Sequence, residues 1–249
     1  MKKFIILIPI YNDWQSLLKL LNNICKIIKS IKGVQFDCVI INDCSTIKSS
    51  KITIPTEINS IKIIHMSKNQ GHARCNAFGI KYLSENSDFD YLILMDGDGE
   101  DRPEEIKSLV KKILLEPNKS VVAKRIKRSE GPLFKMLYIF HKYLTLLMTG
   151  KLIDFGNYSC LTKTDLKILS NKASLWSSYS GSFKDNIKNY NKINSIRGVR
   201  YFGPTHMSLF KLVIHSFSII AVFKNRVFFT SFILLTSLYY LGIFIKFNF

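Results

Sequence analysis

Short apolar runs alternate with longer mixed segments over the first half of the chain. Four of these runs are rich in Ile and Val and are apolar at consecutive positions, a pattern typical of strands that are buried on both faces of a parallel sheet. We therefore predict buried strands at residues 4–10, 36–41, 61–66 and 91–95.

Segments of helical length separate these strands, at residues 13–31, 72–83 and 103–115. Asp13 is a candidate N-cap of the first segment, and Pro103 stands in the first turn of the third with two glutamates beside it, which suits the positive end of a helix. The alternation predicts an α/β sandwich with a mostly parallel central sheet. From Lys124 to about Tyr201 the pattern is less regular and predicts one helix, at residues 133–148.

The end of the chain is different, because residues 227–245 form an uncharged apolar run. As a helix this run would be about 28 Å long, close to the hydrocarbon thickness of about 30 Å in a bilayer. We predict one transmembrane helix; the alternative is a buried core helix.

The segment before this run predicts a helix that lies along the membrane surface. Ser208, Lys211, His215 and Ser218 would share one narrow polar stripe, with apolar side chains around the rest. Basic residues cluster before the span and only Lys246 follows it, so the positive-inside rule predicts a single-pass protein of the cytoplasmic membrane with its large domain in the cytosol. The predicted organisation is a domain at 1–204, a juxtamembrane helix at 205–226, and the span with a short tail at 227–249.

Composition narrows the class of protein. With 47% apolar and 22% charged residues among 249, intrinsic disorder is excluded. The net charge of +18 indicates an anionic partner, which is nucleic acid, a phosphorylated small molecule or an anionic membrane lipid. Five cysteines without a C-x-x-C pair favour a reduced compartment.

The strongest chemical signal is an acidic turn, Asp96-Gly-Asp98-Gly-Glu100-Asp101, directly after the fourth strand. Ligands of open α/β sheets bind beyond the carboxyl ends of strands. Asp96, Asp98 and Glu100 can converge on Mg²⁺ or Mn²⁺, which would bridge to the phosphates of a nucleotide. The alternative is an acidic surface turn that caps the next helix, but the position after an apolar strand favours the metal.

Two other strands end in similar residues, so acids and amides form one rim. Asp13 follows the first strand and Asp43 the second, where Asp43 would accept hydrogen bonds from a base or ribose and Tyr11 would pack against a ring. The chain lacks both G-x-G-x-x-G after the first strand and a P-loop motif. An acidic rim also argues against a nucleic-acid partner.

Taken in order, these motifs resemble a family 2 glycosyltransferase of GT-A fold. They are residues 8–13, 42–45, Asn69-x-Gly71 and the acidic turn. Residues 122–125, 154–161 and 197–207 resemble the polyprenyl-phosphate branch, similar to the dolichyl-phosphate mannose synthases, and the likeness covers about residues 3–223.

The resemblance implies a nucleotide diphosphate sugar as donor. Asp98 would be catalytic, and Asp96, Asp98 and Glu100 would hold the Mg²⁺ or Mn²⁺. A helix start with a glycine and Arg74 suits anionic oxygens. The expected donor-binding residues are Pro9, Tyr11, Asp13, Asp43, Asn69, Gly71, Arg74 and Asp96.

The implied acceptor is a polyprenyl phosphate, either undecaprenyl or dolichyl. Arg125 and Arg200 would be catalytic as clamps on its phosphate, with Arg128 and His206 beside them. His206 stands where the family commonly has Lys, and Glu100 where many members have Gln.

The expected reaction is an inverting, metal-dependent transfer of a hexose on the cytosolic membrane face. A rival is transfer to the hydroxyl of a lipid-linked or cell-surface saccharide, with a carboxylate such as Asp101 as base. A second rival is a non-catalytic membrane-attached binding protein. Anionic membrane lipid is an expected partner, and an oligomer or a partner membrane protein remains open.

Overall fold

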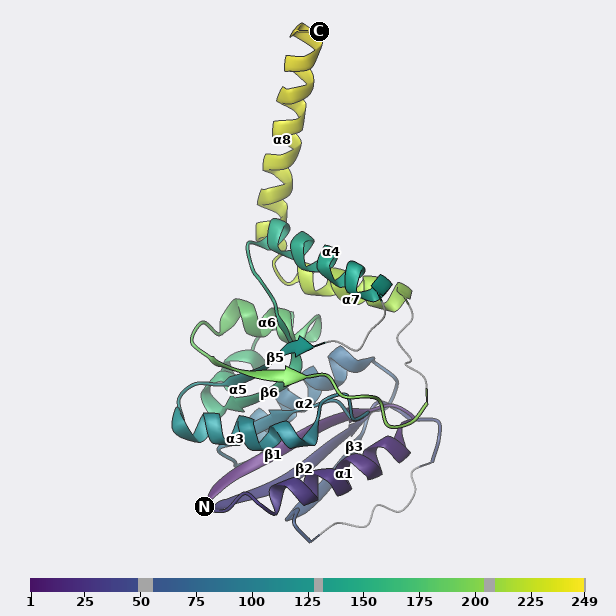
Figure 1. Cartoon of the computed structure of the whole chain (residues 1–249), viewed down its shortest axis with the longest axis vertical. Helices are drawn as coiled ribbons and strands as arrows, with labels where there is room; N and C mark the ends of the chain where they lie inside the picture. The colour runs from purple at the N-terminus through teal and green to yellow at the C-terminus, as the bar shows by residue number, and fades with distance from the viewer. Residues whose placement is uncertain (49–55, 128–131, 204–208, 249) are drawn as a thin grey trace.

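A computed structural model describes residues 1–48, 56–127, 132–203 and 209–248 of the chain. Its centre is a sheet of seven strands in the order β3-β2-β1-β4-β6-β5-β7, in which neighbours pair in parallel except that β6 is antiparallel to β4 and β5 (Figure 1). The strands are β1 (Lys2–Ile10), β2 (Val34–Asn42), β3 (Ser60–His65), β4 (Tyr91–Leu94), β5 (Val121–Lys127), β6 (Phe155–Thr162) and β7 (Asn191–Ile196).

Helices cover both faces of the sheet. The core on one face includes side chains of α1 and α3, and the core on the other face includes side chains of α2, α5 and α6. These helices are α1 (Trp14–Ile28), α2 (His72–Asn86), the 3₁₀ turn η1 (Pro103–Glu105) with α3 (Ile106–Leu115), α5 (Lys163–Ser170), the turn η2 (Ala173–Trp176) and α6 (Tyr179–Asn186).

The central strand β1 shows why consecutive apolar residues are needed. Successive side chains of a strand point to opposite faces, so Phe4 and Ile6 enter the core beside α1 while Ile5 and Leu7 enter the core beside α2. The predicted α/β fold is confirmed, and β1, β2 and β4 are buried as expected. β3 is also a strand, but its predicted burial on both faces is wrong, because it lies at the sheet edge and is largely half-buried or exposed.

The middle of the chain is more regular than its sequence indicates. It contains β6, β7, α5 and α6 besides the expected helix, which is α4 (Pro132–Thr149). β6 has no apolar pattern because it buries polar groups that form hydrogen bonds. The Ser159 hydroxyl bonds the Tyr179 hydroxyl at 2.5 Å, and the Thr162 backbone amide donates to the Ser120 hydroxyl at 3.1 Å. β7 is polar because it is an edge strand in which five of the six residues are half-buried or exposed and only Ser195 is buried.

Three helices lie outside the sandwich. α4 and α7 (Leu209–Ala221) lie side by side above the sheet, and α8 (Lys224–Asn248) projects away from them (Figure 1). Among the described helices, Lys224–Lys246 is long and apolar enough to cross a membrane, with a mean hydropathy of 1.9 and 0% of its apolar window buried in the protein. The core-helix alternative is therefore not supported. The boundaries at 204 and 226 stay predictions, and residues 204–208 lie outside the described part.

Candidate functional site

The carboxyl ends of β1, β2 and β4 meet at one edge of the sheet. Because β1 pairs in parallel with both neighbours, the segments that follow these strands emerge together, as expected for ligand sites in open α/β sheets. The structure brings Asp13, Asp98 and Arg200 into direct contact there, although Arg200 lies about a hundred residues further along the chain.

Asp43, after β2, is almost completely buried, at 3% exposure. Both of its carboxylate oxygens accept backbone hydrogen bonds, from the amides of Gln70 at 2.7 Å and Gly71 at 2.8 Å. Gly71 has a φ of +85°, a conformation that glycine adopts without strain. Asp43 therefore shapes the loop before α2, and its expected contact with a base or ribose stays a prediction.

Asn12 joins the ends of β1 and β2. It has a φ of +56°, its amide donates to the Ser45 hydroxyl at 2.8 Å, and its side-chain oxygen accepts from the amides of Thr46 at 2.8 Å and Ile47 at 3.0 Å. This network leaves the neighbouring Tyr11 with an exposed side chain, at 42%. An exposed ring at the mouth of the rim is free to stack on a planar group.

The acidic turn after β4 folds tightly against β1. A Cβ on Gly97 would lie 3.1 Å from the Pro9 carbonyl oxygen, so a side chain at this position would crowd the strand. Asp101, at 3% exposure, accepts the Asp96 amide at 2.9 Å, and Asp98 accepts the Glu100 amide at 3.0 Å. The carboxylates are thus held by their own backbone.

Each side chain of this turn that carries a negative charge also meets a basic group. The Asp96 carboxylate lies 3.2 Å from His72 Nε2, and Asp101 lies 3.4 Å from the Arg125 guanidinium. Arg200 binds Asp98 at 3.0 Å.

Two further ion pairs complete this arrangement. Arg200 also pairs with Asp13, and Arg197 pairs with Glu100. Both arginines come from the segment after β7, so this segment closes one side of the rim.

The acids are crowded enough to disfavour full ionisation. Burial, and next the charge of Asp96, raise the pKa of Asp98 to about 6 and that of Asp101 to about 7. Burial also opposes ionisation of Asp96 itself, but the adjacent His72 outweighs it and keeps the pKa of Asp96 below its usual range. A divalent cation bound at the turn would therefore stabilise the ionised form of these carboxylates.

The carboxylates of the acidic turn could supply some, but not all, of the ligands of such a cation. Among the described residues, which include all three expected metal ligands, no group of three His, Cys, Asp or Glu side chains is arranged to hold an ion. Mg²⁺ is often held by one or two carboxylates, with substrate phosphates and water as the other ligands. Asp96 and Asp98 are two carboxylates of this kind, paired here with His72 and Arg200, and the Glu100 carboxylate is paired with Arg197.

Other expected residues lie away from these ion pairs or outside the description. Arg74 is exposed and donates to the Gln70 side chain at 3.1 Å, and Asn69 is exposed in the same loop. Pro9 is buried in β1. Arg128 and His206 lie outside the described residues, so their expected contacts with the acceptor phosphate stay predictions.

Sequence reasoning missed three side chains that line the acidic turn. They are His72 and Asn157, which approach the Asp96 carboxylate at 3.2 and 3.3 Å, and Arg197. The Asn157 amide also bonds His72 at 2.8 Å. His72 is the first residue of α2, Asn157 lies on β6 and Arg197 follows β7. β6 and the segment after β7 have no distinctive apolar pattern, and the signal for Arg197 was the resemblance of residues 197–207 to the family.

An α/β sandwich with an acidic turn beyond β4, a rim of strand-end carboxylates and arginines facing them defines the architecture of a nucleotide-sugar transferase. The sequence agrees, because residues 5–207 match the model of the family Glycosyl transferase family 2. The chain belongs to this family, as the motifs predict.

Two curated relatives are similar over part of the chain. An undecaprenyl-phosphate 4-deoxy-4-formamido-L-arabinose transferase of Photorhabdus laumondii is 29% identical over 165 residues, which cover 65% of this chain and 48% of the relative. An uncharacterized protein of Methanocaldococcus jannaschii is 30% identical over 113 residues, which cover 44% of this chain and 46% of that protein. The chain thus spans about half the length of these relatives.

Solved structures confirm the fold. Glucosyl-3-phosphoglycerate synthase from Mycobacterium tuberculosis, in complex with Mn²⁺, UDP and glucosyl-3-phosphoglycerate, aligns with a TM-score of 0.62 at 13% identity, over 90% of this chain and 80% of that one. The S. aureus TarS fragment 1–349 aligns with a TM-score of 0.52 at 15% identity, over 91% and 71% of the two chains. At these identities the likeness shows the GT-A architecture alone.

Proposed function

We propose that this protein transfers a hexose from a nucleotide diphosphate sugar to a polyprenyl phosphate, with inversion, at the cytosolic face of a membrane. The observation that carries the proposal is the pairing of Arg200 and Arg125 with the acidic turn, beside two helices that expose apolar side chains. Such an arrangement offers a cation for a lipid phosphate and an apolar surface for its chain.

The donor would bind along the strand-end rim. Tyr11 stacks on the base, Asp13 faces the nucleoside, and the loop that Asp43 holds, with Asn69, Gly71 and Arg74, faces the nucleotide. Asp96 and Asp98 would hold Mg²⁺ or Mn²⁺, with Glu100 as the third expected ligand. Bound there, the ion neutralises the charge that develops on the departing nucleoside diphosphate.

The acceptor needs positioning more than activation. A phosphate monoester has its second pKa near 6, so it is already an anionic nucleophile at neutral pH. One of its oxygens forms the new bond to the anomeric carbon while the bond from that carbon to the nucleoside diphosphate breaks, which inverts the centre. Arg125 and Arg200 offset the repulsion between the incoming phosphate and the acidic turn.

The helices above the sheet supply the membrane contact in this proposal. α4 and α7 lie between the sandwich and α8 (Figure 1), and they expose large apolar side chains. Burial, and then the charges of His72 and His141, hold the pKa of His215 on α7 below its usual range. Among the described side chains, the exposed large apolar residues are Met136, Ile139, Phe140, Tyr143, Leu146 and Leu147 on α4 and Phe210, Val213, Ile214 and Phe217 on α7.

The rival acceptor, a saccharide hydroxyl, would need a general base. Asp101 is the carboxylate expected in that role. One of its oxygens accepts the Asp96 amide, and the other accepts a hydrogen bond from the Arg125 guanidinium. Asp101 is also only 3% exposed, so a saccharide hydroxyl has little access to its carboxylate, although a pKa of about 7 would suit a base. The geometry therefore favours the phosphate acceptor.

The test is a transfer assay with membranes that contain the full chain. Labelled sugar nucleotides are supplied with Mg²⁺ or Mn²⁺ and either undecaprenyl phosphate or lipid-linked saccharides, and the lipids are extracted. We expect label in the phosphate lipid, a loss of more than about 100-fold in Asp98→Ala, and little change in Asp88→Ala, whose carboxylate is 99% exposed. Label only in a saccharide hydroxyl would contradict the acceptor, and nucleotide-sugar binding without transfer would favour the non-catalytic rival.

A further inference from the structure

The segment between β7 and α7 is fixed to the acidic turn by its backbone. The Gly198 amide donates to the Glu100 carbonyl at 2.8 Å, and the Tyr201 amide donates to the Asp98 carbonyl at 2.9 Å. The approach is close, since a Cβ on Gly198 would lie 2.7 Å from the Gly99 carbonyl oxygen. The guanidinium of Arg200 is therefore presented by a backbone that is bonded to the turn it faces.

The Tyr201 ring fills the space under this turn. Gly99 has a φ of +90°, and a Cβ built on it would lie 2.5 Å from the Tyr201 ring. The ring is packed against the buried core on the α1 face of the sheet. Tyr201 thus contacts the acidic turn with its ring and with its backbone.

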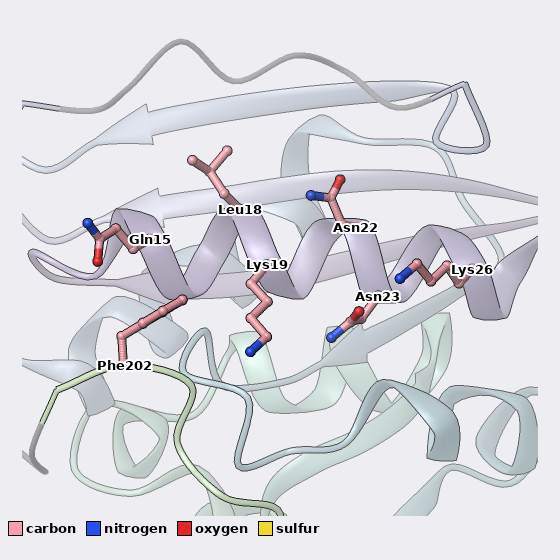
Figure 2. A pocket seen from close by; sticks show the side chains of 7 residues that line it. All are labelled: Gln15, Leu18, Lys19, Asn22, Asn23, Lys26 and Phe202. Atoms are coloured by element: carbon pink, nitrogen blue, oxygen red, sulfur yellow. The ribbon is translucent and has the colours of Figure 1, made fainter.

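Helix α1 holds the other side of the same ring. The Asn23 amide donates to the Tyr201 hydroxyl at 2.9 Å, and the Lys19 ammonium lies 4.8 Å from the Tyr201 ring centroid and 5.3 Å from that of Phe202. Figure 2 shows the Lys19 and Asn23 side chains pointing to the side of α1 where Phe202 lies, whereas the Asn22 side chain, which lines the same pocket, points away from Phe202. An ammonium over an aromatic face and a hydrogen bond to its hydroxyl fix both position and rotation of a tyrosine.

We propose that Tyr201 is a positioning residue that ties α1 to the acidic turn and to Arg200, and that Asn23 and Lys19 hold its ring. Arg200 also donates from Nε to the Phe202 carbonyl at 3.0 Å, so its direction follows the backbone at 200–202. When the ring is released, this backbone loosens and Arg200 meets the acceptor phosphate less often. This inference rests on the proposed function, in which Arg200 holds that phosphate.

The test uses two variants that remove the same hydrogen bond, Asn23→Ala and Tyr201→Phe, and their double variant. Steady-state transfer to undecaprenyl phosphate in vesicles is measured with the sugar nucleotide that the wild type uses. The acceptor KM should rise about two- to tenfold in each single variant, the range for loss of one net hydrogen bond, while kcat and the donor KM stay within about twofold. The double variant should be no worse than the stronger single one, because both remove one interaction.

Asn22→Ala is the matched control, and it should leave every parameter unchanged. Hydrogen exchange at the Gly198 and Tyr201 amides gives a readout that does not depend on the acceptor: exchange should be faster in Asn23→Ala and not in Asn22→Ala. Unchanged exchange, additive effects of the two single variants, or equal rises in the two KM values would overturn the positioning role. Absence of transfer by the wild type, with the exchange result as expected, would overturn the proposed function alone.

Discussion

Asp43→Asn separates a structural from a ligand-binding role of this carboxylate. The Asp43 oxygens accept the amides of Gln70 and Gly71 at 2.7 and 2.8 Å, and the side chain is 3% exposed. An asparagine has one carbonyl oxygen, so one of the two backbone N–H groups would face an NH₂ group without an acceptor. Leaving a buried donor unsatisfied costs about 1–3 kcal/mol.

For a domain of this size, each kcal/mol corresponds to roughly 2–4 °C in Tm. We therefore expect Asp43→Asn to unfold roughly 2–12 °C below the wild type, measured by thermal unfolding of the full chain in detergent without nucleotide. Asp88→Asn is the control, because its carboxylate is 99% exposed and lies in a solvated ion pair with Lys163, and it should leave Tm unchanged. An unchanged Tm for Asp43→Asn, with loss of nucleotide binding, would refute the loop-holding role and favour direct contact with the nucleotide.

Three further predictions concern packing and acid stability. Gly99→Ala should lower stability by at least about 1 kcal/mol in denaturant unfolding, because φ is +90° and the new Cβ would meet the Tyr201 ring; stability equal to that of the wild type would contradict the close approach. Gly79→Val should cost about 1–3 kcal/mol in the same measurement, since a Cβ there would lie 2.7 Å from Leu7 Cδ1, and a neutral effect would mean that α2 shifts freely on β1. Burial opposes ionisation of Asp37, but hydrogen bonds from Ser60 and Asn59 and the charge of Lys3 hold its pKa below the usual range. Its stabilising contribution is thus complete above the usual carboxyl pKa of about 4 and is lost as pH falls through the lowered value; Asp37→Asn should flatten the acid limb of stability against pH, and an unchanged limb would contradict this.

Strands β1, β2 and β4 could be predicted because a strand that is buried on both faces is apolar at consecutive positions. Phe4 to Ile10 is apolar at nearly every position, since alternate side chains enter two different cores. The same argument fails for β6, where the buried Ser159 hydroxyl bonds the Tyr179 hydroxyl and the Thr162 backbone amide donates to the Ser120 hydroxyl. Hydrogen-bond partners from distant segments are not visible in a local pattern.

In the candidate site, too, some residues could be predicted from the sequence and others could not. Asp13, Asp43 and the acidic turn follow strands and could be located from strand ends alone. The ion pairs that complete the site join residues far apart in the chain, such as Asp13 with Arg200. The segment that carries Arg197 and Arg200 meets the acidic turn through the close approach of Gly198 to Gly99, and no local pattern encodes that distance.

The most direct test of the account is the chemical form of the product. Purified full-length protein is incubated with its sugar nucleotide, a divalent cation and undecaprenyl phosphate, and the reaction is followed by phosphorus NMR. The account predicts that the phosphate monoester signal of the lipid converts into a phosphodiester signal in step with release of nucleoside diphosphate, and that Asp98→Ala abolishes this conversion. A lipid that remains a monoester while the sugar is transferred to a hydroxyl would contradict it.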